Sequence, residues 1–229
     1  MKQKSAEWNY VAVIGDIIES RKIENRQAVQ LKLQSVLDVV NKKYEKSLAS
    51  KFMITLGDEL QGLVRDKRTS VDIISFIVLE MLPICLRFGV GVGEISTDIV
   101  YDNSVKIDGS AYHRARKAIE EIKRRNGGYE EIYTNFMIYS GENTLNLDEM
   151  RNSVLSLCTV VISKWTERQA EIVREYFANG KNQYLTAKAL GIGQPTVSKS
   201  LKKASYYSLR AALNTVKESL EGEIPGRND

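Results

Sequence analysis

The chain has 229 residues and a formal net charge of +4, with 43% hydrophobic and 27% charged residues. This composition is ordinary for a globular protein, and at roughly 150 residues per domain the length predicts one large domain or two small ones. A core of this size folds without disulfide or metal staples. The three prolines and the lack of any low-complexity stretch argue against long disordered linkers.

The residue pattern also disfavours a membrane span and a zinc site. The longest early apolar run, 10–14, is too short for a signal peptide or a membrane span, and Asp16 comes just after it. Cys85 and Cys158 lie far apart in apolar surroundings, which indicates reduced thiols. A zinc site is disfavoured because His113 is the only histidine. We therefore expect a cytoplasmic protein.

Hydrophobic periodicity predicts alternating strands and helices over the first part of the chain. In chain order they are strand 10–16, helix 24–44, strand 51–56, strand 60–64, helix 70–82, strand 87–95, helix 110–125 and strand 131–139, with 147–163 a helix or a mixed connector. The order β-α-β-β-α-β is that of a ferredoxin-like fold, so the expected class is α+β. Glycine at every second position of strand 87–95 lets something approach one face closely.

Basic residues concentrate near the end of the chain. Between positions 164 and 217 there are ten Lys or Arg and three Asp or Glu, a net of +7, which leaves −3 for the rest. A basic module on a mildly acidic body is the electrostatic footprint of nucleic-acid binding. The alternative is a set of ordinary solvated helix faces rich in lysine.

The same segment is predicted to be all helical, with turn signals between its helices. Thr166 can cap the first helix, with Gln169 as its capping-box partner. Gly191 ends a later helix, and Pro195 stands in the first turn of the next, where proline is tolerated.

This pattern resembles the helix-turn-helix of sigma-factor region four and LuxR-like regulators. The matching residues are Thr186, Ala187, Leu190, Gly191, Thr196, Val197, Ser198 and Leu201. The resemblance implies double-stranded DNA as a partner and a homodimer, since one such module binds weakly. Glutamine can read adenine, and lysine can reach guanine or phosphate. The DNA-binding residues expected on the second helix are Gln194, Thr196, Ser198, Lys199, Lys202 and Lys203. The alternative is a three-helix protein-interaction module.

Several motifs stand out in the N-terminal part. They are Asp16-Ile17, the turn Gly57-Asp58-Glu59 followed by Gln61-Gly62, the GVGE of the glycine strand, and the segment DGSAY-x-x-AR that contains Arg114 and Arg116. Together they are similar to the SatD family, and the similarity covers most of the chain, including the C-terminal module. This resemblance implies no particular activity.

The same motifs also resemble the palm of class III nucleotidyl cyclases. The resemblance implies that Asp16, Asp58 and Ile17 hold Mg²⁺ or Mn²⁺ on a nucleotide, because carboxylates on neighbouring strands can share such an ion. Arg116 falls at the position of the transition-state arginine, the one catalytic candidate. Tyr112 stands where the enzymes have an asparagine.

Arg21 and Arg114 join Arg116 as candidate phosphate ligands, since arginines facing phosphates stabilise developing charge. Each of these groups also has a plain structural alternative. Asp16 can cap the following helix, Asp58 can favour the hairpin turn, and the arginines can be surface charge.

These predictions divide the chain into a cyclase-like, ferredoxin-type palm domain (1–140), a connector (141–163), a helix-turn-helix domain (164–220) and a flexible tail (221–229). The favoured function is a DNA-binding transcriptional regulator whose palm senses or dimerises and binds a nucleotide with Mg²⁺. One alternative is a Mg²⁺- or Mn²⁺-dependent nucleotide-processing enzyme localised by the C-terminal module. Another is an interaction protein that binds neither nucleotide nor DNA.

Overall fold

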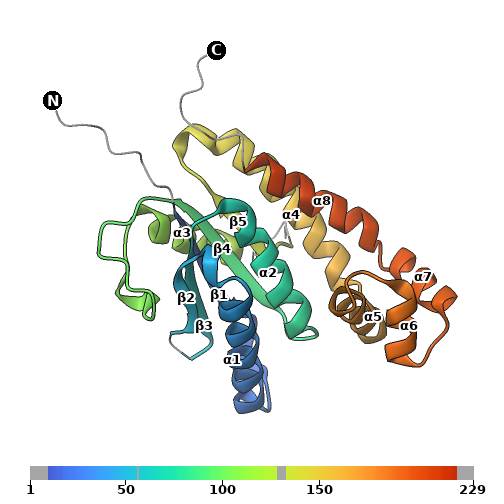
Figure 1. Ribbon diagram of the computed structural model, residues 1–229. Coiled ribbons are helices and arrows are strands. Elements are labelled where there is room, and N and C mark those ends of the chain that lie inside the picture. Colours follow the sequence, from blue (N-terminus) through green and yellow to red (C-terminus); the bar gives the residue numbers. More distant parts are fainter. Residues whose placement is uncertain (1–9, 56, 128–132, 221–229) are drawn as a thin grey trace.

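The computed structural model describes residues 10–55, 57–127 and 133–220. One sheet runs through the N-terminal part in the order β2-β3-β1-β4-β5 (Figure 1). β1 pairs antiparallel with β3 and β4, and β4 pairs parallel with β5. The strands are β1 (Tyr10–Ile17), β2 (Leu48–Ile54), β3 (Glu59–Val64), β4 (Leu86–Gly93) and β5 (Phe136–Tyr139). The predicted α+β class and ferredoxin-like order are confirmed, with β5 added beside β4.

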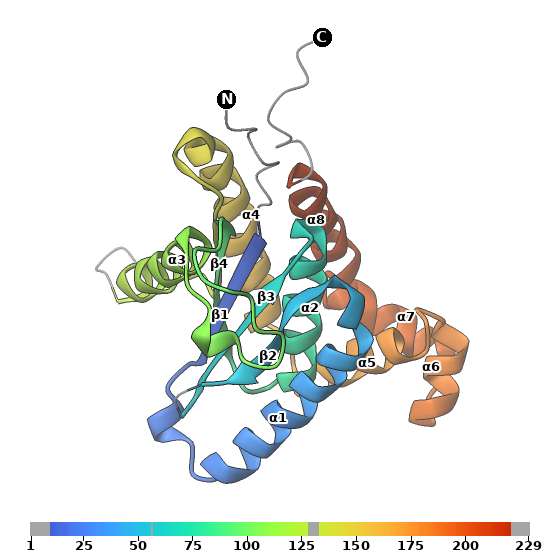
Figure 2. The same cartoon turned by 60° about the vertical axis from the view of Figure 1, so that its left-hand side comes forward.

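Helices cover both faces of this sheet (Figure 2). α1 (Arg26–Lys43) and α2 (Lys67–Met81) lie on one face and α3 (Ser110–Asn126) on the other. The alternation of side chains along β1 explains the two cores, because neighbouring residues of a strand point to opposite faces. Val11 and Val13 pack with α1 and α2, and Ala12 and Ile14 pack with α3.

The glycines of β4 give α3 its place against the sheet. A Cβ atom at Gly89 would lie 2.2 Å from the carbonyl oxygen of Ala115, and one at Gly91 would lie 2.0 Å from that of Ala111. The backbone of α3 therefore occupies the space that side chains would fill. The close approach predicted from the glycine pattern is that of a helix of this same chain.

We expect Gly91→Ala to lower the free energy of unfolding by about 3 kcal/mol, at the upper end of overpacking costs, because the clash is with rigid backbone. Gly127→Ala is the matched control, since its Cβ would meet nothing closer than the carbonyl oxygen of Lys123 at 3.5 Å. Urea unfolding of both variants measures the difference. Equal stabilities would show that α3 does not need the glycine face.

The C-terminal part is built from helices alone. They are α4 (Leu145–Ser163), α5 (Glu167–Ala178), α6 (Gln183–Leu190), α7 (Gln194–Lys203) and α8 (Tyr206–Ser219). α4 packs on β5 and on α8. Val216 of α8 and the following Leu220 belong to the same apolar core as the sheet and α2. A further core lies among α5–α8 and includes Val173, Val197 and Leu201.

Specific hydrogen bonds fix α5 to the end of α2. The guanidinium of Arg174 donates to the carbonyl oxygens of Leu79 and Leu82, both at 3.4 Å. The ammonium of Lys32, which lies on α1, donates to the carbonyl oxygens of Met81 and Leu82 at 3.3 Å. Burial and the nearby Arg174 charge lower the pKa of Lys32. These cations satisfy the last carbonyls of α2, which carry no partner within the helix.

Some element boundaries differ from the sequence-based prediction. β2 begins at Leu48, before the predicted position 51. β5 covers only Phe136–Tyr139 of the predicted 131–139, of which 131 and 132 lie outside the described residues. The reason is that the backbone N–H groups of Thr134 and Asn135 donate to the side chains of Asn126 and Thr159, at 3.1 and 3.2 Å. The region 147–163 is helical throughout, within α4.

Other predictions are not settled by the fold. The tail 221–229 lies outside the described residues, and the boundaries at 140, 163 and 220 stay predictions. Cys85 and Cys158 are both free thiols. None of the helices in the described parts of the chain combines the length and apolar character that crossing a bilayer requires.

Candidate functional site

The α6–α7 pair forms the centre of a compact three-helix arrangement with α5. The three helices contact one another pairwise. Thr166 and Gln169 form the expected capping box at the start of α5. α6 ends at Gly191, which adopts the left-handed conformation with φ of 63°, and Pro195 lies in the first turn of α7. Because glycine enters that conformation without steric cost, the chain can reverse within the turn 191–193.

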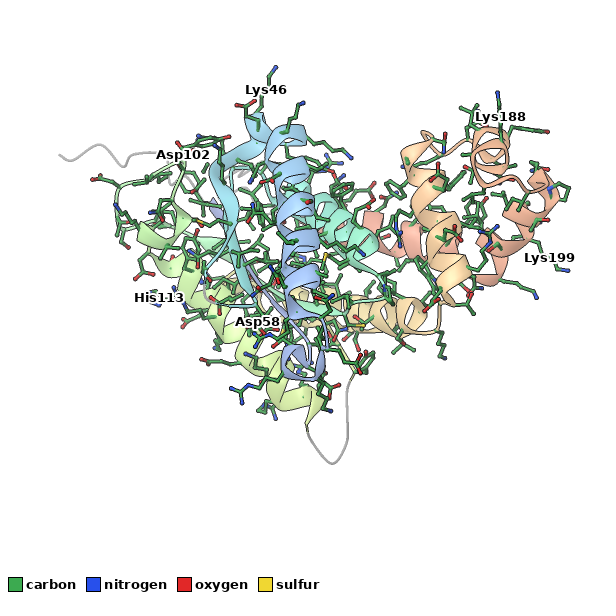
Figure 3. All side chains as sticks on the ribbon, turned by 90° about the horizontal axis from the view of Figure 1, so that it is seen from below. Lys46, Asp58, Asp102, His113, Lys188 and Lys199 are labelled. Carbon is green, nitrogen blue, oxygen red and sulfur yellow. The ribbon has the colours of Figure 1, made fainter. Side chains whose placement is uncertain are left out.

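α7 buries one side and exposes the other. Val197 and Leu201 are fully buried in the core of the three helices. Of the predicted DNA-binding residues, Gln194 and Ser198 lie on the half-buried flanks, and Thr196, Lys199, Lys202 and Lys203 are exposed. Residues three or four apart share a helix face, so Thr196, Lys199 and Lys203 form one stripe. In Figure 3, Lys199 and Lys188 of α6 point away from the body of the protein.

The charge around this stripe is of one sign. No Asp or Glu occurs between positions 176 and 217, whereas seven Lys or Arg do. Within the described residues, no ion pair holds Lys199, Lys202 or Lys203. Their ammonium groups are therefore available to an anionic partner, and nothing on their own helices competes for them.

A hydrogen-bonded chain fixes the first residue of α7. The amide of Gln194 donates to Gln183 Oε1 at 2.6 Å, and the amide of Gln183 donates to the hydroxyl of Tyr207 at 2.9 Å. Gln183 and Tyr207 were not among the residues singled out from the sequence. The signal that could have found Gln183 is its place at the start of α6, matching that of Gln194 at the start of α7.

The aspartate candidate at the end of β1 is already neutralised by this chain. Asp16 is mostly buried, with its side chain 13% exposed. Its Oδ1 lies 2.5 Å from Nε of Arg87, and its Oδ2 lies 3.0 Å from Nζ of Lys123. Both carboxylate oxygens therefore face a cation, and an incoming metal ion would have to displace one of them.

Asp58 and Ile17 lie next to Asp16 through the backbone. Asp16 is paired with Glu59 in the β1–β3 register, and the N–H of Ile17 donates to the carbonyl oxygen of Asp58 at 3.3 Å. The strands therefore bring the predicted metal set together in space. Nowhere in the described residues do three or more His, Cys, Asp or Glu side chains gather in a way that could hold a metal ion.

The three candidate phosphate ligands have different surroundings. Arg21 is exposed in the short turn after β1. Arg114 is half-buried and donates to the carbonyl oxygens of Val92 and Ser140. Arg116 is half exposed and lies 3.5 Å from the carboxylate of Asp108.

Tyr112, at the position of the cyclase asparagine, is fully buried in the core between α3 and the sheet. Burial raises the pKa of its hydroxyl. A side chain sealed in this way cannot touch a nucleotide at the surface. Figure 3 places His113 of α3 and Lys199 of α7 on opposite sides of the molecule, so the two candidate regions do not meet.

A protein-family comparison covers nearly the whole chain, because the model of the SatD family matches residues 10–218. The chain belongs to the SatD family. No curated protein matches it.

Solved structures similar to this SatD family member include a bacterial light-regulated adenylyl cyclase. It is 12% identical, with 57% of this chain and 74% of that chain covered and a TM-score of 0.39. The catalytic core of a rhodopsin-guanylyl cyclase with converted specificity is 20% identical, with 51% and 74% covered and a TM-score of 0.35. A regulator of polyketide synthase expression from Bifidobacterium adolescentis is 15% identical, with 94% and 85% covered and a TM-score of 0.25. Identities and scores this low say nothing about a shared activity.

Proposed function

We propose that this SatD family member is a DNA-binding regulator that reads duplex DNA with α7. The observation that carries the proposal is the exposed lysine group of α7, Lys199, Lys202 and Lys203, in a stretch from 176 to 217 without any acidic residue. A helix that exposes cations and small polar groups, and is held by a second helix across a glycine turn, is a shape that fits a major groove.

The proposed contacts fall into two kinds. The lysines neutralise phosphates and supply affinity that depends on salt but not on sequence. Gln194 and Thr196, at the start of α7, read base edges, because the amide of glutamine can pair with adenine. Gln183 holds the Gln194 side chain through the 2.6 Å hydrogen bond and so lowers the entropy lost on binding. Ser198 lies on the flank of α7 and contacts the sugar–phosphate backbone.

The role proposed for the sheet body is regulatory. α8 inserts Val216 into the core of the body, and α5 is bonded to the end of α2. A change in the body would therefore reach α7 through packed helices. Two copies binding together to two half-sites is part of the proposal, since a single module of this kind binds weakly.

Titration of the full chain against labelled duplex DNA by fluorescence anisotropy tests the proposal. Across salt concentrations, the logarithm of the binding constant should fall linearly with the logarithm of salt, by about 0.9 per phosphate neutralised. Selection from a random-sequence duplex pool should then enrich one motif. Absence of binding at low salt would contradict DNA binding, and binding without an enriched motif would contradict a regulator of specific sites.

A Mg²⁺- or Mn²⁺-dependent nucleotide enzyme is the weaker candidate. The residues around Asp16 do not fit a site for two divalent ions, because Arg87 and Lys123 already occupy both carboxylate oxygens. Fixed cations of the chain supply there the positive charge that metal ions would bring. Arg116 also lacks its partner, since Tyr112 is buried. We derive no catalytic step from these residues.

A further inference from the structure

A cavity of about 440 Å³ lies between the sheet body and the C-terminal helices. Its walls come from α2, α4, α5 and α8, from the end of α1, and from the segments before β4 and β5. The volume falls in the range of roughly 300 to 1,000 Å³ that is typical of small-molecule sites. It lies between the apolar core of the sheet body and the apolar core of α5–α8.

The inner surface of the cavity is mostly apolar. Phe76, Val78 and Leu213 flank the core of the body, and Leu82 and Trp165 flank the core of the C-terminal helices. All five are only partly buried although they line an interior space. Apolar surface of this kind gains free energy when an apolar molecule displaces water from it.

Two polar atoms of the wall are buried, and one of them has no partner among the described residues. The Oδ1 atom of Asn135 and the hydroxyl of Tyr206 are both buried. Among the described residues Oδ1 accepts no hydrogen bond, whereas the hydroxyl of Tyr206 lies within hydrogen-bonding reach of Arg210. Tyr206 as a whole is 3% exposed. Buried polar groups are nearly always paired, so the unpaired Oδ1 atom of Asn135 indicates a polar group that arrives from outside.

The charges that line the cavity are predominantly positive. The cations are Lys43, Lys181, Arg210 and Lys217, and the one acid among the lining residues is Asp72, which forms an ion pair with Lys217. Lys43, Lys181 and Arg210 are exposed, so their charges lie where the cavity opens to solvent. Lys43 lies over the ring of Phe76, 4.6 Å from its centroid.

We propose that this cavity binds an anionic amphipathic small molecule, such as an organic acid with an aromatic or branched apolar body. The apolar body fills the space between α2, α4, α5 and α8. The acid group pairs with an exposed cation at the opening, and a donor of the ligand bonds to the Oδ1 atom of Asn135. Because the walls belong both to the body and to the helices that carry α7, such a ligand joins the two parts.

Binding of two dyes to the full chain, without DNA, tests this site independently of the proposed function. One is 8-anilinonaphthalene-1-sulfonate, and the other is N-phenyl-1-naphthylamine, which has the same apolar body but no sulfonate. Saturable binding of the anionic dye at one site, about tenfold tighter than that of the neutral dye, is the expected result. No saturable binding, or equal binding of the two dyes, would overturn the proposal.

Variants that fill the cavity test whether the dye binds inside it. Ser75→Trp on α2 fills the cavity and should abolish dye binding, whereas Ser153→Trp, on the exposed side of α4, is the matched control and should leave it unchanged. Asn214→Trp, at an exposed position of α8 that lines the cavity, tests the site again if Ser75→Trp does not fold. Binding that survives a folded cavity-filling variant would overturn the assignment.

Two charge variants test the class of ligand. Lys43→Met or Arg210→Met should weaken the binding of the anionic dye roughly tenfold and leave the binding of the neutral dye unchanged. The reason is that only the anionic dye pairs with a cation. If neither variant separates the two dyes, the anionic part of the proposal fails.

Discussion

Replacing Lys199, Lys202 and Lys203 of α7 by alanine is expected to weaken duplex DNA binding by up to about 500-fold near 0.1 M salt. Each lysine that neutralises a phosphate contributes about 0.9 to the slope of log affinity against log salt, so three contribute about 2.7. The three side chains are exposed and have no ion-pair partner in the described parts of the chain, so the loss comes from DNA contact and not from unfolding. Anisotropy titrations of both proteins over a range of salt measure affinity and slope together.

A second triple variant removes the same net charge elsewhere. Lys42, Lys46 and Lys106 are exposed residues of the sheet body, and Figure 3 shows Lys46 far from Lys199. Their replacement by alanine should change the salt slope little, since only lysines close to phosphates release counterions. If both triple variants weaken binding equally, the attraction is one of net charge, and α7 is not the reading helix.

The sequence predicted the order of elements well, because that order depends on local patterns. The continuous apolar run Val11, Ala12, Val13 and Ile14 predicts a buried strand, and in the structure apolar cores lie on both of its faces. The glycine spacing of β4 predicted a close approach on one face but not by what. That α3 of the same chain fills the space follows from the crossover of the chain, which no local pattern contains.

The candidate metal site was predicted only in part. The predicted ferredoxin-like order placed the hairpin of Asp58 beside the strand end that carries Asp16, and the register of β1 with β3 agrees. The prediction could not include Arg87 and Lys123, because the first reaches Asp16 from the neighbouring strand β4 and the second from the far end of α3. Partners this distant in sequence appear only when the sheet and its covering helix are assembled.

The packing of the C-terminal helices against the body could not be predicted from the sequence either. Positive charge and turn signals distinguish 164–217 from the rest, and these signals favoured a separate module. In the structure, Lys217 of α8 forms an ion pair with Asp72 of α2, and Leu220 reaches the core of the body. A helix that is amphipathic on its own does not reveal which surface covers its apolar side.

The buried ion pair of α4 is expected to be the strongest single contributor to this packing. Asp148 and Arg151 have side chains that are 0% and 2% exposed, with Oδ1 and Nη1 2.9 Å apart. The second oxygen of Asp148 accepts the N–H of Ser140 at 2.6 Å, and Nε of Arg151 donates to the hydroxyl of Ser219 at 2.9 Å. Asp148→Asn should therefore lower the free energy of unfolding by about 3 to 5 kcal/mol, since it removes the charge of one member of a buried, hydrogen-bonded ion pair.

Unfolding in guanidinium chloride measures this loss when the slope of free energy against denaturant is the same for the variant and the unchanged protein. The matched control is Glu171→Gln, because Arg168 and Glu171 have the same spacing and a 2.5 Å contact but are 50% and 47% exposed. Loss of that exposed pair should lower the free energy of unfolding by no more than about 1 kcal/mol. A double variant, Asp148→Leu with Arg151→Met, should recover most of the loss, since replacing a buried pair by apolar groups is often neutral. An Asp148→Asn protein as stable as the Glu171→Gln control would show that this ion pair does not help to hold α8 to the body.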